Sequence, residues 1–215
     1  MSPADRCLKV LYQLQEEGQE ATTTAVAARL GVRASSVTEM FQRLERKGLV
    51  RYTPYRGVEL TPKGWERAAE IVRHHRLLEL YLHRHLGYPL ERVHGEAERL
   101  QSVISEEFEE RIARLLGEPE YDPHGGPIPR RDGSVPELVA LPLGALRLGQ
   151  EAIVRRVRDH NVGTLAELVR LGLLPQQRCR LCGRQSGHGA YLLAIAGELV
   201  YLSGAVAGAV FVEPL

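Results

Sequence analysis

The spacing of the apolar residues changes near Glu118, and this change constrains the fold more than any other feature of the chain. Before it, apolar residues recur every three or four positions, which is typical of amphipathic helices. After a stretch rich in Pro, Gly and Asp at 118–137, short β-like runs follow. A chain of 215 residues has room for two or three small domains. We therefore expect a mainly α-helical protein with a small β domain at its C-terminal end.

The first half of the chain predicts a series of helices interrupted by one hairpin. Glycines that stop helices, threonines that cap them and a proline that opens one mark the ends of these segments. The last helix takes its apolar stripe from Val93, Leu100, Val103, Ile104 and Phe108. We expect helices over 3–17, 22–30, 34–47, 62–87 and 90–116, and hairpin strands over 49–53 and 57–61.

The second half predicts a small β-barrel, because closing a sheet of short strands removes its exposed edges. The stretch 118–137 is expected to be an ordered loop or a linker. The glycine-rich run at 202–211 lacks the Lys-Ser/Thr ending of a phosphate loop and is expected to be a tight turn. We expect strands within 151–157, 178–184, 190–197, 198–203 and 208–214, with one short helix over 165–171.

Helix, short helix, glycine-marked turn, helix and hairpin is the order of a winged helix-turn-helix, which binds DNA. Residues 21–70 hold 9 Lys/Arg against 5 Asp/Glu, a local excess of +4 that suits a surface facing phosphates. A helix that is merely solvated normally carries Lys and Glu on its outer face. The outer face of helix 34–47 instead carries short polar groups able to approach base edges: Ser35, Ser36, Thr38, Glu39 and Gln42.

Four further side chains complete the predicted DNA-binding face. Arg33 and Arg43 flank the polar cluster and are suited to phosphate contacts. Tyr55 and Arg56 lie at the tip of the hairpin, which can follow the DNA backbone or enter the minor groove. The alternative is a generic three-helix domain, which would not explain the whole pattern of helices and hairpin.

Two pairs of residues in the middle region have the spacing of metal ligands. His75 and Glu79 are four apart and share one helix face, and His94 and Glu98 repeat this spacing. If the two helices pack side by side, two imidazoles and two carboxylates converge, a mixture that suits Mn²⁺, Fe²⁺ or Zn²⁺. The competing interpretation is a salt-bridged pair of helices in which Arg76 and Arg99 neutralise the carboxylates.

The chain resembles the diphtheria toxin repressor family of iron- and manganese-dependent regulators. The resemblance rests on RASSVTEMFQRLERKGLVRYTPYRGVELTPKG, RHHRLLELYL, RVHGEAERL and the specific run DPHGGPIP. The C-terminal portion resembles the SH3-like, ferrous-transport A-like domain of the longer members. The resemblance implies a homodimer formed through the middle helices, an inverted-repeat operator in double-stranded DNA, and activation by Mn²⁺ or Fe²⁺. We expect that Zn²⁺ can also occupy the site in vitro.

The resemblance also implies how the metal sites are composed. His75, Glu79 and His94 match the family's ancillary site, which a side chain from the barrel usually completes. Asp159 and its neighbour His160 lie in the matching stretch. The family's primary site is altered, because Arg6 stands at its first-helix ligand position, and Gln101 and Ser102 stand where members usually have Glu and His. Glu98 remains, either as a ligand or paired with Arg6.

Several other features favour structural roles. Cys7 suggests a buried, inert helix cysteine. Cys179 and Cys182 have the spacing of a zinc knuckle, but no second pair of ligands accompanies them. No catalytic arrangement stands out, so we do not expect an enzyme. No apolar run reaches the roughly 20 residues that span a bilayer. With no secretory signal evident, a cytoplasmic protein without membrane contact is expected.

The sequence thus predicts a winged helix-turn-helix over 1–70, a helical dimerisation and metal-binding domain over 71–137, and an SH3-like β domain over 140–215. The predicted function is metal-dependent transcriptional regulation, with repression of metal-uptake genes. One alternative is a regulator of the same fold that is permanently competent or answers to another ligand. A second alternative is a metal- or partner-binding module that has lost DNA binding. A hydrolytic zinc enzyme is a third.

Overall fold

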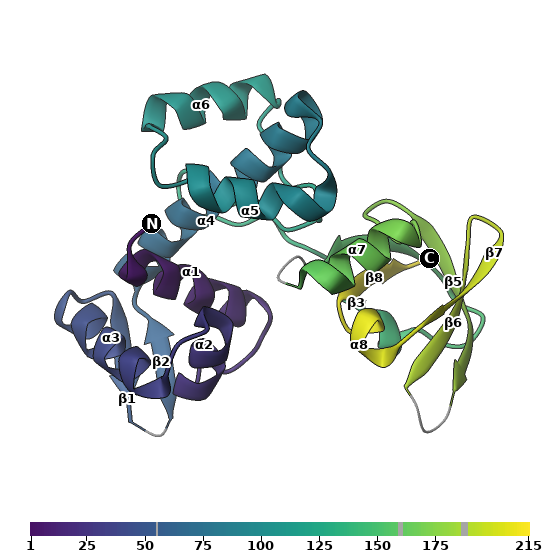
Figure 1. Ribbon diagram of the computed structural model, residues 1–215, viewed down its shortest axis with the longest axis horizontal. Helices are drawn as coiled ribbons and strands as arrows, with labels where there is room; N and C mark the ends of the chain where they lie inside the picture. The colour runs from purple at the N-terminus through teal and green to yellow at the C-terminus, as the bar shows by residue number, and fades with distance from the viewer. Residues whose placement is uncertain (55, 159–160, 186–188) are drawn as a thin grey trace. The chain divides into compact units, whose positions relative to one another are not determined.

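The computed structural model describes residues 1–54, 56–158, 161–185 and 189–215 (Figure 1). Its helices are α1 (Pro3–Glu16), α2 (Thr23–Leu30), α3 (Ala34–Arg46), α4 (Pro62–Leu86), α5 (Leu90–Leu100), α6 (Glu106–Leu115), α7 (Val162–Arg170) and α8 (Gly204–Ala207). Its strands are β1 (Val50–Thr53), β2 (Gly57–Leu60), β3 (Leu141–Pro142), β4 (Glu151–Val157), β5 (Arg178–Gln185), β6 (Ala190–Ile195), β7 (Glu198–Leu202) and β8 (Val210–Pro214). The described residues contain no helix both long enough and apolar enough to cross a membrane.

The chain divides into two compact units, and both α4 and α6 contribute to each of them. Unit 1 comprises Met1–His75, Glu98–Glu109 and Pro129–Val135. Unit 2 comprises Arg76–Ala97, Glu110–Ile128 and Pro136–Leu215. The division of α4 falls directly after His75.

Unit 1 contains the predicted winged helix-turn-helix. Figure 1 shows α1, α2 and α3 gathered round the β1–β2 hairpin. Val37, Phe41 and Leu44 of α3 are buried in one core with the apolar faces of α1 and α2, as the helical spacing predicted. Gly31 caps α2 with φ +65°, a left-handed conformation that glycine adopts without steric cost. The chain can therefore reverse sharply between α2 and α3.

The hairpin is joined to the start of α4 by a tight set of contacts. Its strands are antiparallel, with Val50 opposite Leu60. The Thr61 hydroxyl donates to the Gly48 carbonyl at 2.7 Å and accepts from the Gly64 amide at 3.1 Å. A side chain on Gly64 would collide with the Leu49 carbonyl, because a Cβ there would lie 1.8 Å from that oxygen. Only glycine allows α4 to approach the chain at this point.

The predicted single helix over 90–116 is wrong, because the structure has two helices, α5 and α6, with a turn between them. The Ser105 hydroxyl accepts from the Phe108 amide at 3.2 Å and so caps the first turn of α6. Glu106, Glu107 and Glu109 in that turn suit the positive end of the helix dipole. Val103, assigned to the buried stripe, lies in the turn and is 76% exposed.

Unit 2 contains the predicted β domain as an antiparallel six-stranded sheet in the order β3-β8-β4-β5-β6-β7. Ala152, Val154 and Val157 of β4 are buried in its core; the alternation of buried residues is interrupted after Val154 by a register shift. The fold class is confirmed: mainly α-helical with a small β domain. The glycine-rich run at 202–211 is not a plain turn, because it contains the helical turn α8, capped by the Ser203 hydroxyl.

The stretch 118–137 includes an ordered loop, not a flexible linker. Most of the DPHGGPIP run, residues 122–129, is buried. The Gly125 backbone packs closely against β4, where a Cβ would lie 1.9 Å from the Arg155 carbonyl. The Val157 amide donates to the His124 carbonyl at 2.8 Å. Within unit 2, this loop is therefore fixed directly to the sheet.

Candidate metal centre and DNA-binding face

The outer face of α3 carries the predicted polar cluster. Thr38 is half-buried and its hydroxyl donates to the Ala34 carbonyl at 3.2 Å, which turns it partly toward its own helix. Arg33 precedes the first turn of α3 without capping it. The exposed side chains are Arg33, Ser35, Ser36, Glu39, Gln42 and Arg43. The face thus combines small polar groups with two guanidinium groups, as sequence-specific contact with DNA requires.

The hairpin lies beside this helix and is held to it. The Tyr52 amide donates to the Glu45 carboxylate of α3 at 2.9 Å, and the Tyr52 ring packs on Phe41 with ring centroids 5.3 Å apart. Arg56, at the turn, is exposed. Tyr55, the other predicted contact of the wing, lies outside the described residues.

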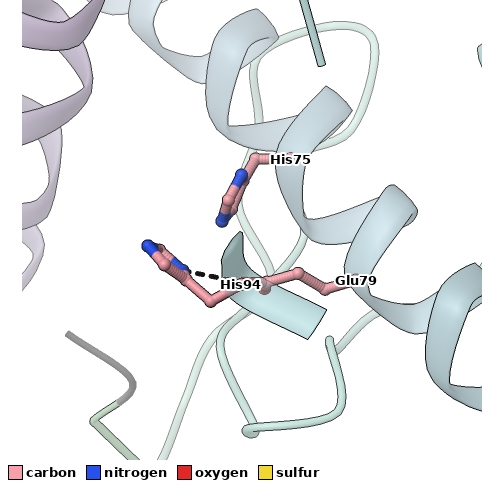
Figure 2. Close-up of side chains that lie close together, drawn as sticks. All are labelled: His75, Glu79 and His94. Carbon is pink, nitrogen blue, oxygen red and sulfur yellow. Dashed lines mark hydrogen bonds and ion pairs between the residues drawn. The ribbon is translucent and has the colours of Figure 1, made fainter. Parts of the chain in front are cut away.

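Three of the predicted metal ligands come together. One donor atom from each of His75, Glu79 and His94 lies within 4.8 Å of the other two. Figure 2 shows the three side chains pointing toward one another, His75 and Glu79 from α4 and His94 from α5. His94 Nδ1 lies 3.0 Å from Glu79 Oε1. The helical spacing therefore predicted a real cluster of donors.

The other oxygen of Glu79 faces residues to which sequence reasoning assigned no role. His124 Nδ1 lies 3.7 Å from Glu79 Oε2. Glu79, Asp122 and His124 are all buried and form a second group of donors close enough to share one ion. The sequence signal was the DPHGGPIP run itself, whose aspartate and histidine are both potential ligands.

Backbone contacts fix the geometry of this loop. Asp122 Oδ1 accepts from the amides of His124 at 2.8 Å and Gly126 at 2.9 Å. His124 Nε2 lies 3.3 Å from the Leu90 carbonyl, at the start of α5. The Arg76 guanidinium lies 3.3 Å from Asp122 Oδ2 and donates to the Pro127 carbonyl. Arg76 thus helps to hold the loop in place through Asp122 and Pro127.

Glu98, the fourth predicted ligand, has a different partner from the one expected. Lys9 Nζ lies 2.8 Å from Glu98 Oε2, whereas Arg6 is exposed to solvent. Burial opposes ionisation of Glu98, but the charge and hydrogen bond of Lys9, together with His75 and Gln101, outweigh it and hold the pKa of Glu98 below its usual value. The suggested Arg6–Glu98 pair is therefore replaced by a Lys9–Glu98 pair. Gln101 and Ser102 lie in the turn after α5, not on a continuing helix.

A third cluster links α4 to α6 within unit 1. Arg73 Nε lies 2.6 Å from Glu109 Oε1, and His74 Nε2 contacts the other oxygen. Burial opposes protonation of His74, but Glu109, with smaller contributions from Glu106 and Glu70, outweighs it and raises the pKa of His74 above its ordinary value. Although Glu70, His74 and Glu106 also approach one another, Glu106 is exposed. These contacts form an ion-pair network that joins the two helices.

The remaining candidates divide between structural roles and undescribed positions. Burial raises the pKa of the Cys7 thiol to about 12 and that of Cys179 to about 11, so neither is a ready nucleophile or ligand. Cys182 is half-buried, and a register shift lies between its neighbours Leu181 and Gly183. Asp159 and His160, the ligands expected from the β domain, lie outside the described residues.

Family models match three successive parts of the chain. Residues 1–58 match the DNA-binding domain of iron-dependent repressors. Residues 61–130 match the metal-binding and dimerisation domain of the same repressors. Residues 141–214 match the FeoA domain. The three matches follow the order of winged helix-turn-helix, middle helices and β domain described above.

Individual relatives match over nearly the whole chain. The iron-dependent repressor IdeR of Mycobacterium tuberculosis is 33% identical over 221 residues, covering 96% of this chain and 94% of the relative. A solved manganese-dependent transcriptional repressor in complex with manganese is 38% identical, with a TM-score of 0.93 over 99% of this chain and 100% of that one. ScaR with bound Zn²⁺ is 32% identical, with a TM-score of 0.86 over all of both chains. The chain belongs to the iron-dependent repressor family of metal-dependent transcriptional repressors.

Proposed function

We propose that the protein is a homodimeric repressor that binds an inverted-repeat operator when Mn²⁺ or Fe²⁺ is bound, and that it lowers transcription of metal-uptake genes in the cytoplasm. The domain division at 1–70, 71–137 and 140–215 is part of this proposal. Its main support is Glu79, a fully buried carboxylate with an imidazole facing each oxygen. Such a mixed nitrogen and oxygen donor set suits first-row divalent metals.

The residues that would hold the ion lie on three segments. His75 and Glu79 come from α4, His94 from α5, and Asp122 and His124 from the buried loop. Asp159 and His160 stay candidate ligands from the β domain. A bound divalent cation supplies positive charge that neutralises the buried carboxylates and ties together elements distant in sequence.

The protein residues then convert ion binding into DNA binding. The His94 and His124 rings orient the Glu79 carboxylate, and Asp122 fixes the loop through its backbone hydrogen bonds. In a dimer, two copies of α3 must match half-sites roughly one helical turn of DNA apart. We propose that ion binding favours the dimer arrangement in which the two helices have that spacing.

Contacts with DNA are assigned to the face of α3 and to the wing. Short polar groups of α3 read base edges, while Arg33 and Arg43 contact phosphates. Arg56, together with Tyr55, is assigned to the backbone or minor groove beside the wing. The residues proposed to read bases are Ser35, Ser36, Thr38, Glu39 and Gln42.

The test is a titration of operator DNA with and without metal. A duplex selected from a random-sequence pool by the Mn²⁺-loaded protein serves as the probe, and fluorescence anisotropy measures its affinity. We expect at least roughly 10-fold tighter binding with Mn²⁺ than with a chelator, within the usual range of coupling between sites. Glu79→Gln should lose this response, whereas Glu66→Gln, an exposed glutamate of α4, should keep it.

The outcomes separate the alternatives. Equal binding of the probe with Mn²⁺ and with a chelator would show a regulator that does not depend on metal. Failure to retain any duplex would show a module that has lost DNA binding. Parallel titrations with Fe²⁺ under anaerobic conditions and with Zn²⁺ identify the ion that gives the largest response.

A further inference from the structure

A lysine lies buried inside unit 1 and forms an ion pair between two helices distant in sequence. Lys9 of α1 is 6% exposed, although lysine is among the residues least often buried. Its ammonium lies 2.8 Å from Glu98 of α5. Removing the charge of a lysine from water costs free energy unless a carboxylate compensates it. Burial of Lys9 therefore depends on Glu98.

The surroundings of this pair are those of a cation site. His75 Nδ1 lies 3.7 Å from the same Glu98 oxygen that binds Lys9. Gln101 is 6% exposed, and its amide nitrogen donates to the Glu98 carbonyl at 3.3 Å. The Gln101 side-chain oxygen is buried and has no hydrogen-bond partner within the described ranges. An imidazole and a positive charge thus face the same carboxylate oxygen, and a buried side-chain amide follows directly after α5.

We propose that the Lys9 ammonium is a built-in cation, which takes the place at Glu98 that a divalent metal would otherwise occupy. The chain then has one regulatory metal centre, at Glu79, and its link between α1 and α5 does not depend on metal. The count of one ion rests on the proposed function, but the role of Lys9 does not. Glu98 and His75 are residue types that bind metal, but a divalent ion does not fit beside them, because the charge of Lys9 repels it.

The role of Lys9 predicts that removing its charge opens a second metal site. Lys9→Glu places a second carboxylate beside Glu98, His75 and Gln101, a donor set suited to Mn²⁺. Calorimetric titration with Mn²⁺ is carried out on Glu79→Gln and on the double variant Lys9→Glu/Glu79→Gln. We expect about one further equivalent of Mn²⁺ in the double variant, as that donor set implies. No gain over Glu79→Gln would overturn the proposal.

A second variant, Lys9→Met, tests the same proposal if Lys9→Glu fails to fold. Lys9→Met keeps the length of the side chain but leaves the half-buried Glu98 without its cation, so it should unfold at a lower temperature. Mn²⁺ should raise its melting temperature more than that of the wild type, because only this variant gains a site. Lys9→Met/Glu98→Gln should lack the additional rise, and Lys63→Met, which changes an exposed lysine of α4, should match the wild type. Equal rises in Lys9→Met and the wild type would contradict the inference.

The two proposals fail in different ways. A wild-type protein that binds no Mn²⁺ would contradict the metal centre at Glu79, while a gain in Lys9→Glu/Glu79→Gln would still support the role of Lys9. A wild-type protein that binds about two equivalents, with Lys9 intact, would reject the built-in cation and leave metal-dependent repression standing.

Discussion

At the scale of single residues, His124 and Glu109 are buried polar groups whose contacts join distant parts of the chain. His124 is 2% exposed, and its two ring nitrogens face the Leu90 carbonyl and the Glu79 carboxylate. Glu109 is also 2% exposed and lies between Arg73 and His74. Each residue joins elements that are far apart in the chain. We expect replacement of His124 to change metal affinity and replacement of Glu109 to change stability.

Replacing His124 should weaken metal binding. His124→Leu removes a ring that orients Glu79 or coordinates the ion directly, and we expect roughly 10- to 100-fold weaker Mn²⁺ binding, as found when partners of metal ligands are removed. Calorimetric titration measures the change. His83→Leu, which alters an exposed histidine of the same region, is the control and should bind like the wild type. An unchanged affinity in His124→Leu would remove this residue from the metal centre.

Replacing Glu109 should lower stability in a manner that depends on pH. Burial opposes ionisation of Glu109, but His74 and Arg73 outweigh it and lower the pKa of Glu109 below its ordinary value. Its stabilising contribution is therefore fully present above the ordinary glutamate pKa and is lost as pH falls through the lowered value. At neutral pH Glu109→Gln should cost about 3 kcal/mol, because Arg73 loses its buried carboxylate.

Urea denaturation of the metal-free protein at several pH values tests this expectation. The difference between the wild type and Glu109→Gln should shrink as the solution is acidified below the ordinary glutamate pKa. Glu107→Gln, on the exposed side of α6, is the matched control and should cost little at any pH. A difference that grows on acidification would show that Glu109 is not ionised in the folded protein.

At the scale of elements, the contact between the wing and α4 depends on one glycine. Gly64 lies where a Cβ would be 1.8 Å from the Leu49 carbonyl, so Gly64→Ala must displace either the hairpin or the first turn of α4. We expect a loss of about 1–3 kcal/mol in stability, the usual cost of overpacking. Because the hairpin moves relative to α3, affinity for operator DNA should fall as well.

Thermal unfolding and the anisotropy assay measure these two effects. Gly95→Ala is the matched control, since Gly95 lies within α5 and a Cβ added there would meet nothing within 4 Å among the described residues. That substitution should stabilise the helix by roughly 0.5–1 kcal/mol, because alanine has the higher helix propensity. Equal stability of Gly64→Ala and the wild type would show that the close approach at Leu49 is easily relieved.

At the scale of the whole molecule, the proposed dimer should bind DNA with a strong dependence on salt. Each phosphate contact releases a counterion, which contributes roughly 0.9 to the slope of log affinity against log salt concentration. Arg33→Ala and Arg43→Ala should each reduce the slope by about two, since a dimer presents two copies of each residue. Anisotropy titrations from low to moderate salt with saturating Mn²⁺ measure the slope. Arg170→Ala, on α7, should leave it unchanged.

Unchanged slopes in both α3 variants would mean that these arginines do not contact phosphates. The winged helix-turn-helix would then meet DNA through other residues, and the positive excess of residues 21–70 would have another explanation. A reduced slope in Arg33→Ala alone would restrict the phosphate contacts to the start of α3.

Local patterns in the sequence determined most elements of this protein. Helical spacing placed Val37, Phe41 and Leu44 in the core and put His75 and Glu79 on one face, because side chains four apart on a helix share a side. The same spacing also predicted a single helix over 90–116, because apolar residues continue at helical intervals through Val103, whereas the structure ends α5 at Leu100 and caps α6 with Ser105. That cap is visible in the sequence and could have been recognised.

Only the tertiary structure decided which distant residues meet. Lys9 instead of Arg6 pairs with Glu98, and the 122–129 loop brings His124 to Glu79. These contacts join positions separated by tens of residues, so they depend on how helices and loop pack, which periodicity does not specify. The sequence by itself determined the family, the DNA-binding element and three clustered donors. Packing decided the further donors and the cation beside Glu98, because burial makes each charge depend on its neighbours.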